Sequence, residues 1–237
     1  MLFRSPAQGD DENHADDIDS HGRQRDGTNR PRQVQDTKSK RFPTGDRSRQ
    51  ISGGSALKCG MALKSTIYKT ALSISDMDRN YYADHTLTVA CHPSETAERM
   101  MVRLLAFALN AHEYLTFGKG LSDIVEPDLW QKDLTGAIEH WIEAGQPDEK
   151  RILKACGRAA RVTVYAYSHN AELWWKPIAD QLARARNLAV MRIAPDAARA
   201  LSKLAARNMQ LQCTIQEGQV WFSNTDETVQ LEPLSMR

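Results

Sequence analysis

Two contrasting patterns of apolar residues divide this chain near residue 61. Residues 1–60 are rich in Asp, Arg, Gly and Ser and hold few, scattered apolar residues before Ile51. Such a segment cannot bury enough apolar surface to offset the entropy of ordering it, and no apolar run of a secretory signal follows Met1. We therefore predict that residues 1–60 are a disordered extension or the product of a start codon set too early. The second explanation is favoured, with Met61 as the true first residue and 61–237 as one domain.

From residue 61 onward, apolar residues recur at the spacings of strands and of helices in turn. Alternation predicts a hairpin from strands at 65–74 and 84–91, and a second hairpin near the C-terminus that turns at Glu217-Gly218. Ser94 is expected to cap the first helix. The elements predicted between the hairpins are helices over about 95–110, 148–159, 171–185 and from Pro195 onward, and strands near 115–117, 137–143, 162–167 and 188–193.

This order of elements predicts the fold class. Strands that alternate with helices require crossover connections and some parallel pairing, whereas the two hairpins add antiparallel pairs. The predicted fold is therefore α/β, with a mixed central sheet flanked by helices and with an added N-terminal hairpin and C-terminal hairpin.

Charge and cysteine content narrow the function classes. The chain holds 31 Lys and Arg against 30 Asp and Glu, of which residues 1–60 contain 11 and 9, so that 61–237 carries a net charge of −1. A near-neutral domain is not a bulk nucleic-acid coat protein, and any phosphate binding requires a local patch. The four cysteines are far apart, without a C-x-x-C pair, which favours a reducing cytoplasm. No apolar run approaches membrane-spanning length, so no membrane partner is expected.

Two acids about eleven residues apart are the first candidates for chemistry. Asp128 follows a proline at the edge of a strand, and Glu139 lies inside the next apolar strand. Two such carboxylates can bind one divalent cation when adjacent strands bring them together, which requires an approach within roughly 6 Å. Alternation places Glu139 and Glu143 on the face opposite Ile142. The alternative is that this face is simply solvated.

The helix that follows carries a basic stripe. Lys150, Lys154, Arg158 and Arg161 fall within an arc of about 80° on a helical projection, opposite an apolar side that must face the sheet. Beside a pair of carboxylates, this stripe could hold a phosphate backbone, which makes Lys150, Arg158 and Arg161 candidate substrate-binding residues. A solvated helix face is the plainer alternative.

Short motifs spread over 61–237 add a resemblance to a known family. They are His92-Pro-Ser-Glu-Thr, Glu98-Arg-Met-Met, Glu126-Pro-Asp, Trp141-Ile-Glu, Gly145-Gln-Pro-Asp-Glu-Lys-Arg-Ile, Trp174-Trp and Thr214-Ile-Gln-Glu-Gly-Gln-Val-Trp. With these motifs the chain closely resembles the YaeQ family of bacterial proteins, over essentially all of 61–237 and none of 1–60.

The resemblance implies a fold like that of the PD-(D/E)XK nucleases, with a restriction-endonuclease-like core. Pro127-Asp128 matches the PD element, and Glu139 matches the (D/E) position. Trp141 stands where that pattern has its lysine. The positively charged side chain is therefore expected from the following helix, with Lys154 as the first substitute and Lys150 as the second.

Together these residues predict a Mg²⁺- or Mn²⁺-dependent nuclease that hydrolyses phosphodiester bonds. Asp128 and Glu139 would hold the metal with Glu98, which matches an acid that the superfamily places on its first long helix, and Lys154 would stabilise the phosphate. The alternative is a catalytically inactive nuclease-fold module that binds nucleic acid or protein, including one linked to transcription. The missing in-strand lysine favours the module, and the carboxylates on one sheet face favour the enzyme.

Overall fold

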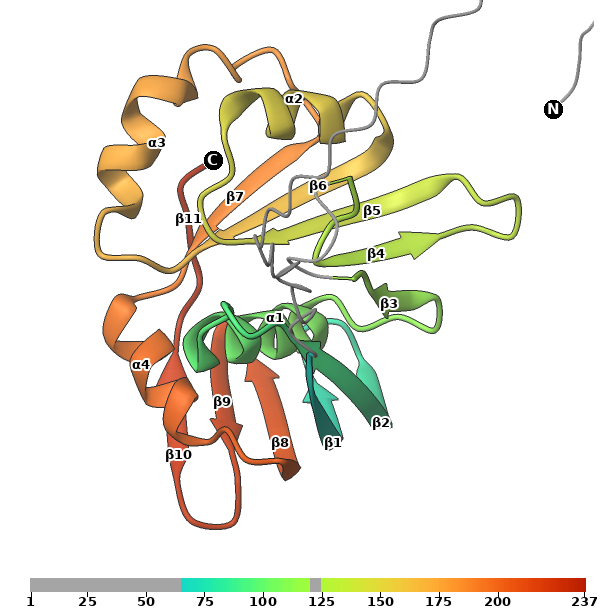
Figure 1. Ribbon diagram of the computed structural model, residues 1–237, viewed down its shortest axis with the longest axis vertical. Helices are drawn as coiled ribbons and strands as arrows, with labels where there is room; N and C mark the ends of the chain where they lie inside the picture. Colours follow the sequence, from blue (N-terminus) through green and yellow to red (C-terminus); the bar gives the residue numbers. More distant parts are fainter. Residues whose placement is uncertain (1–64, 120–124) are drawn as a thin grey trace, which may run out of the picture. The chain divides into compact units, whose positions relative to one another are not determined.

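Two mixed sheets and the helices around them make up the part of the chain that the computed structural model describes, residues 65–119 and 125–237 (Figure 1). The expectation of a disordered extension or misplaced start at 1–60 lies outside the described residues.

The first sheet has five strands and joins the two predicted hairpins, which are both confirmed. Its order is β10 (Thr228–Leu231), β9 (Gln219–Ser223), β8 (Asn208–Gln216), β1 (Thr66–Asp76) and β2 (Tyr81–Cys91). The β8–β9 turn at Glu217 and Gly218 has positive φ at both residues, as a two-residue turn of the type I′ family requires. Because β1 and β8 pair in parallel, the two hairpins form one sheet, which the local pattern did not predict.

The second sheet has six strands. Its order is β11 (Leu234–Ser235), β7 (Leu188–Arg192), β6 (Ala159–Ala166), β5 (Ile138–Ala144), β4 (Leu129–Lys132) and β3 (Leu115–Phe117). Strands β5, β6 and β7 are parallel, and the others pair antiparallel. The prediction of a single central sheet is therefore wrong. The short strands β10 and β11 were not predicted, and β4 was expected only as a strand edge at Asp128, because such short runs alternate too few times to be recognised.

Four helices connect these strands in the described residues: α1 (Ala97–Leu109), α2 (Glu149–Cys156), α3 (Ala171–Ala179) and α4 (Pro195–Lys203). Helix α1 is capped by Thr96, whose hydroxyl accepts from the amide of Arg99, and not by Ser94. Every residue from Met100 to Ala108 is buried. None of these helices has the length and apolar character needed to cross a membrane.

Helix α1 is buried on all sides because it packs between the two sheets (Figure 1). One core joins α1 to both sheets through residues such as Leu104, Leu211 and Ile142. A second core lies on the other face of the six-stranded sheet, where Trp141 and Val162 meet Ile152 of α2 and Trp175 of α3. This layering brings the first turns of α1 to the strand ends at which β4 begins and β5 ends.

Candidate functional site

Asp128 occupies the centre of a buried ionic cluster at the end of the six-stranded sheet. Its side chain is 2% exposed, and it lies directly before β4. Both carboxylate oxygens accept from Nη2 of Arg99, at 2.7 and 2.9 Å, and Oδ2 also accepts from the amide of Ala144 at 2.7 Å. Nε of Arg103 lies 3.6 Å from Oδ1. A buried carboxylate with these partners is fully hydrogen-bonded, as burial of a charge requires.

The acid beside Asp128 is Glu143. The β4–β5 register pairs Leu129 with Ile142, and the amide of Asp128 donates to the carbonyl of Ile142, so the next residue of β5 lies alongside Asp128. Glu143 is 5% exposed. Its Oε1 accepts from Nε1 of Trp141 at 2.7 Å and from Nε of Arg151 at 2.9 Å.

Glu139 does not reach this cluster, and the expectation that it shares a cleft with Asp128 is wrong. It is exposed, and its carboxylate accepts from Nε2 of Gln131 at 3.1 Å. Glu139 precedes Glu143 by four residues on the same strand, which corresponds to about 13 Å at a strand rise of roughly 3.3 Å per residue. Alternation identified the correct face of β5, but only the register with β4 determines which of its acids meets Asp128.

Helix α1 supplies the other half of the cluster through residues spaced by four. Glu95, Arg99 and Arg103 repeat every four residues and so share one side of the helix and its entry. Nη1 of Arg99 and Nη1 of Arg103 both lie 3.0 Å from Oε1 of Glu95. Three acids, Glu95, Asp128 and Glu143, thus face three arginines, and the cluster is formally neutral.

Burial and the neighbouring acid disfavour the charged form of Glu143. Its pKa is raised to about 6, first by burial and then by the charge of Asp128, against the opposing effect of Arg151. Glu143 therefore titrates close to neutrality, which is typical of residues at functional sites.

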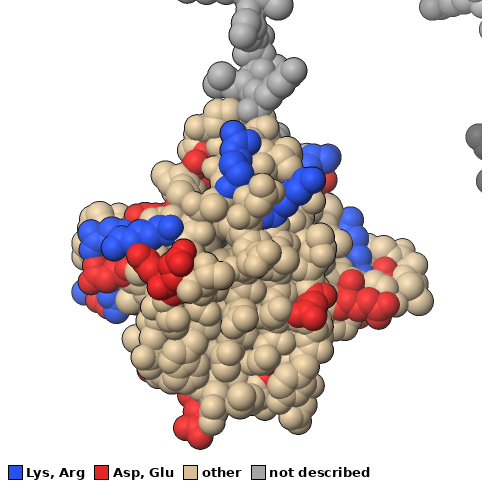
Figure 2. All heavy atoms as spheres, turned by 90° about the horizontal axis from the view of Figure 1, so that it is seen from below, with Lys and Arg blue, Asp and Glu red and all other residues tan. Residues whose placement is uncertain are grey.

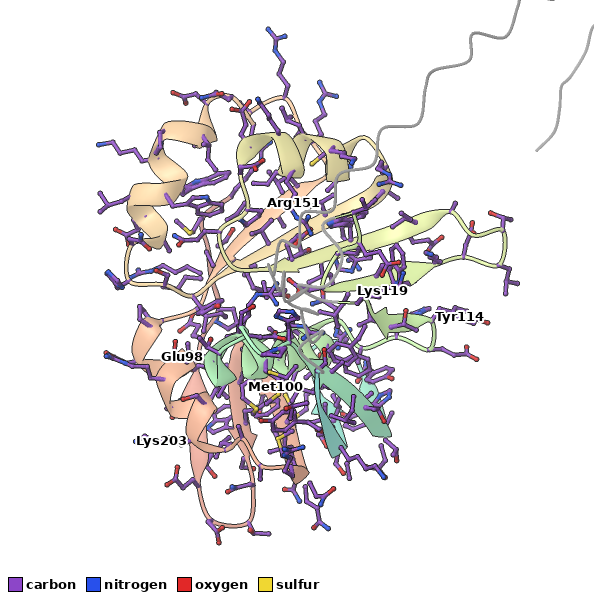
Figure 3. The ribbon with its side chains drawn as sticks, in the orientation of Figure 1. Glu98, Met100, Tyr114, Lys119, Arg151 and Lys203 are labelled. Atoms are coloured by element: carbon purple, nitrogen blue, oxygen red, sulfur yellow. The ribbon has the colours of Figure 1, made fainter. Side chains whose placement is uncertain are left out.

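Arg151 of α2, labelled in Figure 3, is the basic residue of this helix that binds Glu143. Its guanidinium holds Glu143 and also donates to the carbonyl of Glu126 at 2.9 Å. Lys154 and Lys150 are exposed on α2, so the prediction that Lys154 projects to the carboxylates is not met. As predicted, Ile152 and Ala155 form the buried side of the helix.

Arg158 and Arg161, the remaining residues of the predicted basic stripe, lie in different surroundings. Arg158 is exposed, and its guanidinium lies 5.8 Å from the ring centre of Trp141. Arg161 is on β6 instead of the helix, and its Nη2 donates to Nδ1 of His140 at 2.9 Å. The stripe is therefore not one continuous surface, because α2 ends at Cys156 and the chain changes to a strand at Ala159.

Glu98 lies beside the cluster at a cavity of about 310 Å³ (Figure 3). Tyr167, Ser168, His169, Pro195 and Arg199 line the rest of this cavity. Burial raises the pKa of Tyr167, and the charges of Arg99, Asp128 and Glu98 also act on its phenol, which places the cavity next to the ionic cluster. The strands β6 and β7 end here, at the edge where open α/β sheets commonly bind ligands.

Asp128 and Glu143 are the residues that could hold a metal. Within 65–119 and 125–237, no group of three or more His, Cys, Asp and Glu side chains is arranged around a common point. Magnesium commonly binds through one or two carboxylates plus waters and substrate phosphates, so two adjacent oxygen donors are compatible with it. Arg99 and Arg151, whose side chains are 16% and 25% exposed, stand at the outer side of the pair. Asp128 is held by Arg99 of α1 and Glu143 by Arg151 of α2, so a shared divalent cation would require both arginines to release the carboxylates and the two side chains to turn toward each other.

Sequence reasoning missed five members of the ionic cluster: Glu143, Glu95, Arg99, Arg103 and Arg151. Two signals point to them. Glu95, Arg99 and Arg103 recur every four residues in an otherwise apolar helix, where a charge needs a buried partner. Glu143 is the last residue but one of β5, which ends at Ala144, directly before Gly145 with its φ of 122°.

Fold and site together define a class of protein: an α/β domain of two mixed sheets around a buried helix, with an acid–arginine cluster where β4 begins and β5 ends. The chain belongs to the YaeQ family, because the family model for YaeQ protein matches residues 61–233. The resemblance seen in the sequence motifs is thereby confirmed.

Relatives and solved structures agree with this assignment. Uncharacterized protein YaeQ of Salmonella typhi is 44% identical over 173 residues, which cover 73% of this chain and 96% of that protein. The Escherichia coli (strain K12) protein of the same name is 43% identical over 172 residues, covering 72% and 95%. The crystal structure of YaeQ protein from Xanthomonas axonopodis pv. citri superposes with a TM-score of 0.71 at 48% identity, covering 73% of this chain and 98% of that one. The Pseudomonas syringae YaeQ structure has a TM-score of 0.71 at 36% identity, covering 73% and 96%.

Proposed function

We propose that this protein is a divalent-metal-dependent phosphodiester hydrolase with a restriction-endonuclease-like core. One observation carries the proposal: Asp128, directly before β4, lies opposite Glu143 of the antiparallel strand β5, both acids are buried, and Arg151 binds Glu143. The pair follows the PD-(D/E)XK pattern with one revision, since Glu143 takes the position that Glu139 was expected to fill.

The roles of the residues follow from their chemistry. Asp128 and Glu143 would hold Mg²⁺ or Mn²⁺, which when bound polarises a phosphoryl oxygen and lowers the pKa of a bound water. Arg99 and Arg151 hold the same carboxylates in the present structure. On binding, both guanidinium groups would transfer to phosphate oxygens, for which their planar donors are well suited. Arg103 is 1% exposed and stays with Glu95.

The cavity beside Glu98 supplies a place for the substrate. At about 310 Å³ it is near the lower end of ligand pockets, which span roughly 300–1,000 Å³. Its hydroxyl, imidazole and guanidinium groups are hydrogen-bonding partners for a sugar–phosphate unit. Its position next to Asp128 would put the scissile bond at the cluster.

A second function is favoured by a specific observation. Counting from Glu143, the lysine position of the PD-(D/E)XK pattern is Gly145, and both carboxylates are already paired with arginine. These features are expected of a catalytically inactive nuclease-fold module that binds nucleic acid or protein.

Calorimetric titration of the full chain with MnCl₂ at pH 7.5 tests the proposal. It is repeated with two variants that each replace a glutamate of β5 by glutamine. Glu143→Gln should weaken Mn²⁺ binding by about tenfold or more, because it removes a ligand, whereas Glu139→Gln should bind like the wild type. Incubation with single-stranded DNA, duplex DNA and RNA should give Mn²⁺-dependent cleavage that only Glu143→Gln loses.

Three outcomes distinguish the two functions. Cleavage that requires Mn²⁺ and Glu143 supports the hydrolase. Nucleic-acid or protein binding without Mn²⁺ binding and without cleavage supports the inactive module. Equal Mn²⁺ affinities for Glu143→Gln, Glu139→Gln and the wild type would remove Glu143 from the metal site.

A further inference from the structure

Strand β8 is longer than the strand that pairs with its outer side. The last β8–β9 pair is Gln212 with Ser223, and from there the chain enters the β9–β10 turn. On its other side, β8 pairs with β1 from Asn208 onward. Residues 208–211 therefore have a strand neighbour on one side only, within the described part of the chain.

Backbone groups of Asn208 and Gln210 point to this open side. The amide of Lys69 donates to the carbonyl of Arg207, which directs the backbone of Arg207 toward β1. Successive residues of a strand direct their N–H and C=O groups to opposite sides, so Met209 and Leu211 also face β1. Asn208 and Gln210 face away from it, and no backbone hydrogen bond joins them to the 224–227 turn among the described residues.

A cavity of about 530 Å³ occupies the same place. Its wall includes Asn208 to Leu211 on one side and Asn224 to Asp226 on the other, with Leu204 from the end of α4. The turn opposite β8 is fixed, because the side chain of Asn224 accepts from the amides of Asp226 and Glu227. Both walls of the opening are therefore fixed in position.

The cavity carries little charge. Lys69 and Asp226 are the charged residues in its lining. On the side of the molecule where the five-stranded sheet lies, Figure 2 shows charged side chains mainly around the margin and other residues across the middle. A neutral wall with free backbone groups selects for main-chain hydrogen bonding instead of a charged ligand.

We propose that this opening is a binding site for a short extended peptide of a partner protein, which adds to β8 in line with β9. Its backbone pairs with the N–H and C=O groups of Asn208 and Gln210. Its inward side chains are short and apolar and pack on Leu204 and Met209, while its outward side chains are polar. This site does not depend on the proposed hydrolase.

Amide hydrogen exchange of the full chain tests the geometry first. The amides of Met209 and Leu211 should exchange slowly, and those of Asn208 and Gln210 should exchange at least about tenfold faster. Equal protection at all four positions would overturn the proposal. Protection of Asn208 and Gln210 that rises with protein concentration would identify a second copy as the occupant, and the peptide site would then be wrong.

A peptide titration tests the occupant. The probe is an acetylated and amidated five-residue peptide, Ser-Val-Thr-Val-Ser, added to about 1 mM, where even a weak site is half filled. Binding should slow exchange at Asn208 and Gln210 by about tenfold and leave Met209 and Leu211 unchanged. A control peptide with N-methylated valines should give no protection.

A variant completes the test. Gln210→Pro removes the N–H that faces the opening but no bond to β1, so it should keep the fold, measured by its thermal midpoint, and lose the peptide effect. The peptide site would be overturned if the probe did not slow amide exchange at Asn208 and Gln210. It would also be overturned if the N-methylated control protected these amides equally, or if Gln210→Pro bound the probe as well as the wild type.

Discussion

The two ends of β5 differ sharply, although one alternating pattern runs through both. At its start, Glu139 is exposed, and His140 is a buried neutral group held between Arg161 and Thr163. At its end, Glu143 is a buried acid next to another acid, with Arg151 beside it. Alternation decides which face a residue occupies, but the neighbouring strands and helices decide whether that position becomes a solvated surface or an ionic site.

The largest expected effect comes from removing the centre of the ionic cluster. Asp128→Ala removes one of the two acids that Arg99 and Arg103 share and leaves only Glu95, and the loss of one partner of a buried ion pair costs roughly 3–5 kcal/mol. Urea unfolding should show this loss in the free energy of unfolding. Glu139→Ala, at the exposed end of the comparison, should change it by no more than about 0.5 kcal/mol. A loss below about 1 kcal/mol for Asp128→Ala would show that the cluster is not buried as described.

His140 makes the start of β5 sensitive to acid. Burial and then the charge of Arg161 lower its pKa from 6.5 to about 3, so the folded state disfavours the protonated ring. Stability from this group is present above pH 6.5 and is lost as the pH falls toward 3. At pH 5 the wild type should have lost about 2 kcal/mol relative to His140→Gln, at roughly 1.4 kcal/mol per pH unit. Urea titrations of both proteins at pH 7 and pH 5 measure this loss. If the free energies of unfolding of the two proteins changed equally between these pH values, His140 would not be a buried neutral group.

Glu143 gives the end of β5 the opposite dependence. Its pKa is raised from 4.5 to about 6, so the folded state favours the protonated carboxyl. The stabilisation is complete below pH 4.5 and is lost as the pH rises through 6. Between pH 4.5 and 7 the wild type should lose about 2 kcal/mol relative to Glu143→Gln. Urea titrations of the wild type and of Glu143→Gln at pH 4.5 and pH 7 check the sign. A wild type that gains stability over this range would show that the charge of Arg151 outweighs the effect of burial on the pKa of Glu143.

A smaller effect is expected at the turn that ends β5. Gly145 has a φ of 122° and open space where a Cβ would lie, so alanine is strained by the backbone alone, at a cost of about 1 kcal/mol or more. Gly157 has a helical φ and is the matched control, because alanine there meets only ordinary contacts. Thermal unfolding should show a lower midpoint for Gly145→Ala than for Gly157→Ala. Equal midpoints would mean that the turn tolerates a side chain.

The sequence predicted the local elements better than their assembly. The alternation around Leu211 and Phe222 predicted the C-terminal hairpin, and the spacing of Met100, Leu104 and Ala108 predicted α1. Local patterns contain no information on the β1–β8 pairing, which joins residues more than 130 positions apart, so the second sheet was missed.

The members of the ionic cluster were predicted only in part, for the same reason. Asp128 was singled out as an acid at a strand edge about eleven residues before Glu139 and by its match to the PD element, and the face of Glu143 followed from alternation. The choice between Glu139 and Glu143 depends on the β4–β5 register, which includes an irregularity at Gln131 and Lys132. Arg151 and Lys154 are both on α2, and which of them reaches the acids depends on how the helix is rotated against the sheet.

The central claim is that Asp128 and Glu143 form a cation site that arginine closes at rest. An anomalous difference map from crystals soaked in MnCl₂ above pH 7 tests it most directly, since Glu143 is then ionised. The account predicts a peak within ~2.0–2.6 Å of an oxygen of each carboxylate, with Arg99 and Arg151 turned away from them. A map without a peak at this position, in which Arg99 and Arg151 still bind the two acids, would contradict the account.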